Sequence, residues 1–137
     1  MPKYAYKDVI AILLEHFPEF TETENFKHGV FPEITYSVWG AFGQYITDYM
    51  LKLPASELDS DELVARTFDL ANELLDSGDD ETQTIVVIEL FENFYSYRKT
   101  LNLARRKLLP RHLHWLEKQG QWISTSDQNL ENEPGED

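Results

Sequence analysis

The sequence predicts an all-α fold: a single domain of five or six antiparallel helices, arranged as a bundle or as a short solenoid-like stack. Apolar residues recur at spacings of three and four in the long segments, which is the pattern of one buried helix face. Prolines, glycines and capping acids separate these segments. No segment shows a convincing alternation of apolar and polar residues, so no strand is expected.

The first helix is expected from Tyr4 to about Phe17, where the following proline ends it. Residues 21–32 read as a connecting loop. A second helix starts near Pro32, a residue suited to a first turn, and its apolar spacing continues to Leu53.

Gly40 and Gly43 lie one turn apart inside this second helix. Each glycine costs about 1 kcal/mol relative to alanine in a helix, so their presence needs a reason. We expect close approach of another helix, with a kink or a ligand-facing surface as the alternatives.

A third helix begins after Pro54, with Asp59 or Ser60 as its N-cap and Glu62 completing a capping box. Gly78 is expected to end this helix.

The fourth helix contains the stretch "TIVVIELFENF", and Asp79 or Asp80 is its expected N-cap. Its β-branched residues also suit a strand, but the apolar pattern continues too far for one. A helix that is apolar nearly all round is expected at the centre of the fold. Two further helical segments follow, one on either side of Pro110.

The chain divides into a helical domain over residues 1–123 and an acidic tail over residues 124–137, which we expect to be disordered. There is no cysteine, no apolar run of membrane-spanning length and no signal-peptide pattern. These features predict a cytoplasmic protein that does not insert into a membrane.

The charge is unevenly distributed. Residues 56–94 carry 12 acidic and one basic residue, whereas residues 95–123 carry one acidic and seven basic residues. The net charge of −13 argues against binding nucleic acid through its phosphates. The two segments are expected either to pair internally or to leave one strongly negative face.

Two glutamates interrupt the apolar run of the fourth helix. On an α-helical wheel Glu89 shares a polar arc with Thr82, Asn93 and Ser96, so we expect it to be solvated. Glu92 falls between two apolar positions, at the edge of the packed face. A structural ion pair with Arg66, Arg98, Arg105 or Arg106 is one interpretation of Glu92; a partner-facing, substrate-facing or catalytic carboxylate is another.

The sequence offers little catalytic chemistry. His112 and His114 point about 200° apart on a helix, so they cannot bind one metal ion together. No Glu-x-x-His pair, phosphate-binding glycine loop or nucleophile elbow is present. We therefore expect no enzyme activity, no metal and no cofactor.

The segments "LLEHFPEF", "YSVWGAFGQYI", "FDLANELLDSGDDETQTIVVIELFENF", "KLLP" and "HWLEKQG" follow one another in an order that resembles a family of short, acidic, all-helical bacterial proteins. These proteins look like the immunity proteins of polymorphic and contact-dependent toxin systems. The resemblance covers residues 8–122. Glu92 matches an acidic position of the family pattern, whereas Glu89 stands where a small residue is expected.

The resemblance implies an immunity protein that binds and neutralises a cognate toxin through an acidic surface. The residues expected to contact the partner are the acids of the negative segment: Asp59, Asp61, Glu62, Asp69, Glu73, Asp76, Asp79, Asp80, Glu81, Glu89 and Glu92. Three alternatives stay open: an acidic DNA mimic, a helical interaction module of a larger assembly, and a small-ligand or enzymatic domain that uses Glu92. The oligomeric state is not predicted.

Overall fold

The computed structural model describes residues 3–31 and 33–122, and these residues form helices without a strand. The predicted acidic tail at 124–137 lies outside the described residues. The all-α prediction is confirmed, but the expected five or six helices are too few, because short helices occupy two of the expected connections.

The N-terminal part consists of η1 (Tyr6–Asp8), α1 (Val9–His16), η2 (Pro18–Glu22) and α2 (Glu24–Gly29). The loop expected at residues 21–32 is thus partly wrong. Thr23 caps α2 by accepting a hydrogen bond from the Phe26 amide at 3.3 Å, and the Phe26 ring packs edge-on against Phe20.

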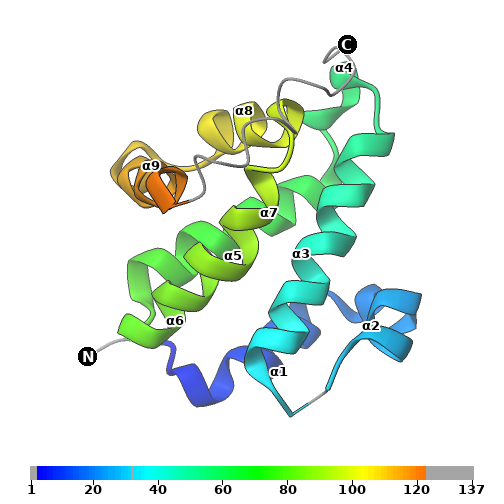
Figure 1. The fold of residues 1–137 in the computed structure, drawn as a ribbon, viewed down its shortest axis with the longest axis vertical. Coiled ribbons are helices and arrows are strands. Elements are labelled where there is room, and N and C mark those ends of the chain that lie inside the picture. The colour runs from blue at the N-terminus through cyan, green and yellow to red at the C-terminus, as the bar shows by residue number, and fades with distance from the viewer. Residues whose placement is uncertain (1–2, 32, 123–137) are drawn as a thin grey trace.

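Three long helical runs form the centre (Figure 1). The helix α3 (Thr35–Lys52) is followed by the short α4 (Ala55–Leu58) and by α5 (Glu62–Ser77), which runs in the opposite direction. The third run is continuous from Asp80 to Phe94 and comprises α6 (Asp80–Ile85), η3 (Val86–Phe91) and α7 (Glu92–Phe94). The segment η3 is a π-helical turn.

The caps of these helices refine the sequence predictions. Asp61, not Asp59 or Ser60, is the N-cap of α5 and accepts a hydrogen bond from the Val64 amide at 3.0 Å. Gly78 follows α5 as predicted, and Asp79 caps α6. Asp79 also accepts a hydrogen bond from the Tyr6 amide, so this cap holds the N-terminal segment against the α5–α6 turn.

The C-terminal part consists of α8 (Arg98–Lys107), η4 (Pro110–His112) and α9 (Leu113–Trp122). The helix α8 lies at one end of the central runs, against α3 and α7, whereas α9 packs beside η3 (Figure 1). The run from Asp80 to Phe94 contacts α3, α5 and α9, which confirms its predicted central place.

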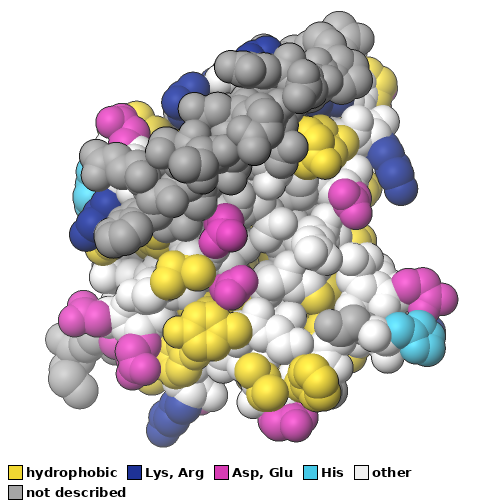
Figure 2. Space-filling model, viewed as in Figure 1, with side chains coloured by type: hydrophobic (Ala, Val, Ile, Leu, Met, Phe, Trp, Pro, Cys, Tyr) yellow, Lys and Arg dark blue, Asp and Glu magenta, His cyan; other side chains and the backbone are white. Residues whose placement is uncertain are grey.

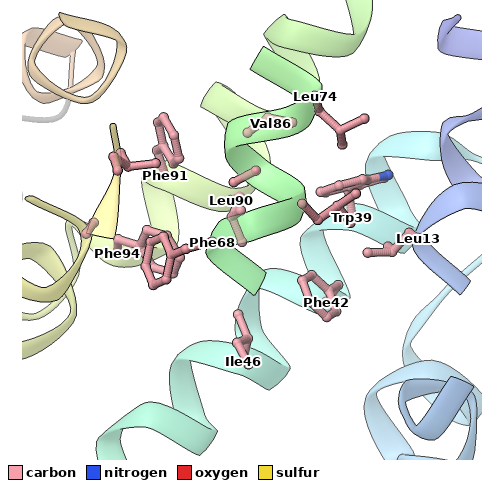
Figure 3. Close-up of a cluster of buried hydrophobic side chains, with 14 of the residues drawn as sticks. Leu13, Trp39, Phe42, Ile46, Phe68, Leu74, Val86, Leu90, Phe91 and Phe94 are labelled. Atoms are coloured by element: carbon pink, nitrogen blue, oxygen red, sulfur yellow. The ribbon is translucent and has the colours of Figure 1, made fainter. Parts of the chain in front are cut away.

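Side chains from α1, α3, α5, η3 and α7 meet in the hydrophobic core (Figure 3). Trp39 and Phe42 of α3, Phe68 of α5 and Phe91 of η3 are almost completely buried there. This core fixes α3 against η3, and the polar groove described below lies along the same contact.

Candidate functional site

A polar groove lies between α3 and the helical run from Asp80 to Phe94. The α3 side of the groove is formed by Tyr36, Ser37, Gly40, Ala41 and Gln44. The opposite side is formed by Ile88, Glu89, Glu92, Asn93 and Ser96, and Asn25 of α2 closes one edge. The groove has a volume of about 460 Å³, which lies within the range typical of binding sites.

The two glycines of α3 permit this arrangement. A Cβ atom at Gly43 would lie 2.8 Å from the backbone oxygen of Glu89 and 2.4 Å from Nδ2 of Asn93. A Cβ atom at Gly40 would lie 3.2 Å from Oε2 of Glu89. The predicted close approach of another helix is confirmed, and Gly40 faces the groove as well.

Glu89 is half-buried in the groove rather than solvated, so that expectation was wrong. Burial raises the pKa of its carboxyl above the usual range, and the nearby Glu92 raises it further. Among the described residues, no side chain or amide donates a hydrogen bond to the Glu89 carboxylate, and no basic residue pairs with it. Glu89 is therefore a partly desolvated carboxylate whose charge nothing in the described chain offsets.

Glu92 is exposed at the same groove, so its expected place at the edge of the packed face was also wrong. None of the predicted arginine partners forms an ion pair with it in the described part of the chain. Arg66 pairs with Glu19 and Glu62, and Arg106 pairs with Asp59.

The π-helical turn η3 accounts for both errors. A π turn takes about one more residue than an α turn, so side chains within it depart progressively from their places on an α-helical wheel, and those that follow it are displaced by roughly 100°. The buried residues of η3 are Val86, Val87, Leu90 and Phe91, and this placement turns Glu89 toward α3 and Glu92 outward. The grouping of Glu89 with Asn93 and Ser96 was nevertheless correct, because all three line the groove, whereas Thr82, expected on the same polar arc, is completely buried.

A smaller pocket of about 260 Å³ continues the groove along α3. It shares Gln44, Asn93 and Ser96 with the groove and adds Thr47, Asp48 and Tyr97. Thr47 is only 4% exposed, and its hydroxyl oxygen has no hydrogen-bond partner among the residues that the structure describes. A buried polar atom without a partner is uncommon in folded proteins and calls for an explanation.

Most of the other predicted contact residues make internal contacts. Asp59 pairs with Arg106 and Lys107, Glu62 with Arg66, Glu73 with Lys3, and Asp76 with Arg111 and His112, while Asp61 and Asp79 cap helices. Asp69, Asp80 and Glu81 are exposed and make no ion pair with a described residue.

The structure therefore brings Glu89 and Glu92 together at the groove, whereas the other predicted acids lie on other elements and six of them make internal contacts. Figure 2 shows Asp and Glu side chains of one face lying singly or in pairs between uncharged groups rather than in a continuous patch. Of the two expectations for the charge, internal pairing with the basic C-terminal segment accounts for Asp59 and Asp76.

Sequence reasoning missed the α3 side of the groove. Its signal was a polar stripe at helical spacing: Ser37, Gly40, Gln44 and Asp48 recur on one side of α3, with the buried Thr47 at the edge of the stripe. A stripe of this kind is normally a solvated face, and only the tertiary contact with η3 turns it into a groove.

The described residues contain no group of three or more side chains that could hold a metal ion. Within the same residues, no helix has the length and apolar character needed to cross a membrane. What the groove offers chemically is a negative, hydrogen-bonding surface that suits a positively charged group.

Comparison with known proteins gives a family. No curated protein and no solved structure matches this chain. A family match spans residues 10–122 and so includes α3, η3 and α7, which build the groove. The chain belongs to the family described as "Domain of unknown function (DUF7674)".

Proposed function

We propose that this protein is an immunity protein, which binds a cognate toxin and neutralises it, and that the groove between α3 and η3 is its contact site. The observation that carries the proposal is the Glu89 carboxylate, half-buried and without a donor or a basic partner among the described residues. A partner that supplies positive charge would offset the charge of this carboxylate.

The energetic reason is desolvation. A carboxylate that loses water without gaining a donor is destabilised, and part of that cost remains in the free protein. A lysine or arginine of a partner would restore the missing interactions and would leave Glu92 as a second acceptor. Complementary charge would also raise the association rate, which suits a protein that must capture a toxin quickly.

Exposed apolar side chains lie next to the groove. Phe31, Ile34 and Tyr36 are 66%, 46% and 50% exposed, and Tyr36 also lines the groove. Aromatic side chains beside a charged contact commonly contribute much of the binding energy of a protein interface. This combination supports a protein partner.

The resemblance to immunity proteins supports the biological role. Such a protein needs a stable scaffold and a complementary surface rather than catalytic residues. The fold supplies the scaffold, because α3 and η3 are held together through the core.

The test is site-specific cross-linking followed by a toxicity assay. A photoreactive phenylalanine analogue replaces Tyr36 at the groove, and in a matched control it replaces Asp69, which is exposed on α5. We expect the Tyr36 variant to capture one partner in the native cells and the Asp69 variant to capture none. The captured protein should stop growth when expressed alone, and co-expression with this protein should restore growth.

A harmless captured partner would overturn the immunity role. Capture from Asp69 but not from Tyr36 would overturn the groove as the contact site.

One observation favours a second candidate, a small cationic ligand. The groove volume of about 460 Å³ and its hydrogen-bonding lining also suit a small molecule. Native mass spectrometry of the protein isolated from its host distinguishes the two, since a bound small molecule would add a discrete mass that Glu89→Gln removes.

The DNA-mimic alternative has less support. It requires carboxylates spaced along a ridge like phosphates, whereas most acids of residues 59–79 cap helices or form ion pairs.

A further inference from the structure

The groove and the smaller pocket form one elongated negative site. They share Gln44, Asn93 and Ser96, so the two lie next to each other along α3. Among the described residues, their linings contain three carboxylates, those of Glu89, Glu92 and Asp48, and no lysine, arginine or histidine. A ligand that fills the whole site therefore meets negative charge near both ends.

The spacing of the two ends follows from α3. Gly40 lies opposite Glu89 at one end, and Asp48 lies at the other end, eight residues further along the helix. Eight residues of α-helix rise about 12 Å. In an extended chain, residues i and i+4 lie about 13 Å apart and point to the same side.

Thr47 gives independent support for a ligand at the second end. Thr47 is 96% buried and lines the smaller pocket, yet its hydroxyl has no hydrogen-bond partner in the described chain. An ammonium group carries three N–H donors, so one that reached Asp48 would have donors left for the Thr47 oxygen.

We propose that the partner enters this site as an extended segment with two basic side chains four residues apart, one paired with Glu89 and Glu92 and the other with Asp48 and Thr47. The residue midway between the two basic residues faces Gln44, Asn93 and Ser96, so a short polar side chain suits it. This inference rests on the proposed function for the identity of the partner, but its chemistry can be tested without the toxin.

The test uses three capped pentapeptides as probes: Lys-Ser-Ser-Ser-Lys, Lys-Lys-Ser-Ser-Ser and Lys-Ser-Ser-Ser-Ser. Each is titrated into the full-length ¹⁵N-labelled protein, and the amide signals of Gly40 and Asp48 report on the two ends. We expect Lys-Ser-Ser-Ser-Lys to shift both signals and to bind about fivefold more tightly than the single-lysine peptide, the gain of one further ion pair. Lys-Lys-Ser-Ser-Ser should show a smaller gain in affinity over the single-lysine peptide and should leave one of the two amide signals unshifted.

Variants assign the two ends. Asp48→Asn should reduce binding of Lys-Ser-Ser-Ser-Lys to the level of the single-lysine peptide, and Glu89→Gln should remove the shift at Gly40. Asp8→Asn is the matched control, since it makes the same change of charge at an exposed residue that lines neither the groove nor the pocket, and it should change nothing.

Equal affinity for the two double-lysine peptides, or an equal loss in Asp8→Asn, would overturn the proposal in favour of unspecific attraction to a negative protein. Spermidine, titrated in parallel, distinguishes a free polyamine: binding tighter than that of every peptide would overturn the protein segment as the occupant. A captured toxin whose affinity is unchanged in Asp48→Asn would leave the immunity role standing and overturn only this inference.

Discussion

A side chain at Gly40 would meet Oε2 of Glu89 at 3.2 Å, whereas one at Gly43 would meet the backbone oxygen of Glu89 at 2.8 Å. The two glycines therefore serve different purposes. Gly43 allows the backbones of α3 and η3 to approach, and Gly40 leaves room for a flexible carboxylate that faces the groove.

The first prediction separates these purposes. Gly43→Ala should lower the free energy of unfolding by about 1–2 kcal/mol, because the clash with the helix backbone and with Asn93 exceeds the gain in helix propensity. Gly40→Ala should leave stability unchanged or raise it by up to about 1 kcal/mol, because the end of the Glu89 side chain can move. Urea denaturation of both variants measures the difference. Equal effects would show that the two positions are equivalent.

The second prediction concerns Glu89→Gln. The pKa of Glu89 is higher in the folded protein than in the unfolded chain. The protonated carboxyl therefore contributes stability at low pH, and this contribution is lost as the pH rises through the pKa of the folded state. A glutamine at this position does not ionise, so Glu89→Gln should be more stable than the wild type at pH 7.5, and this difference in stability should be smaller at pH 4. The variant should also bind the partner more weakly. Denaturant midpoints at the two pH values test this. Glu92→Gln is the matched control and should show a smaller change, because Glu92 is exposed.

The all-α class, the central place of the Asp80–Phe94 run and the close contact at the glycines could be predicted from sequence. Each depends on local periodicity or residue size, which the chain expresses directly. The α2 helix could not be predicted, because its stability depends on the Thr23 cap and on packing of Phe26 against Phe20. Polar residues in that segment indicate a loop when the tertiary contact is unknown.

The site was predicted only in part. Glu89 and Glu92 were singled out because carboxylates in an apolar run need a reason, but their exposures were interchanged. An α-helical wheel assumes a constant angle per residue, and the π turn at Val86–Phe91 changes that angle. The contribution of Asp48 and Thr47 depends on which helix lies opposite α3, and no local pattern contains that information.

The third prediction concerns Asp76, which accepts hydrogen bonds from Arg111 at 2.6 and 2.8 Å and lies 2.7 Å from Nε2 of the buried His112. Arg111 and then His112 lower the pKa of Asp76 to about 2. Because this pKa is lower in the folded than in the unfolded state, ionised Asp76 stabilises the fold at any pH above the pKa of the unfolded chain. This stabilisation is lost as the pH falls from about 4 toward 2.

Asp76→Asn should therefore cost on the order of 1–2 kcal/mol at neutral pH, a value reduced by the partial exposure of the site. The difference from the wild type should vanish near pH 2. Acid unfolding followed by circular dichroism tests this, with Asp69→Asn on the same helix as a control that should follow the wild type. If the stability difference between Asp76→Asn and the wild type persisted below pH 2, it would come from packing rather than from the charge of Asp76.

The last prediction concerns Asp61, which caps α5 through the Val64 amide and accepts a hydrogen bond from the Tyr49 hydroxyl at 2.8 Å. This bond raises the pKa of Tyr49 to about 12, because the neutral hydroxyl is the donor and the carboxylate opposes a phenolate. Asp61→Asn should retain the cap, since asparagine caps as well as aspartate, but should return the Tyr49 pKa toward 10. Asp61→Ala should lose both the cap and the hydrogen bond from Tyr49, and its free energy of unfolding should be lower by about 1 kcal/mol. Ultraviolet titration of tyrosine and urea denaturation measure the two effects separately, and an unchanged Tyr49 pKa in both variants would contradict the contact as its cause.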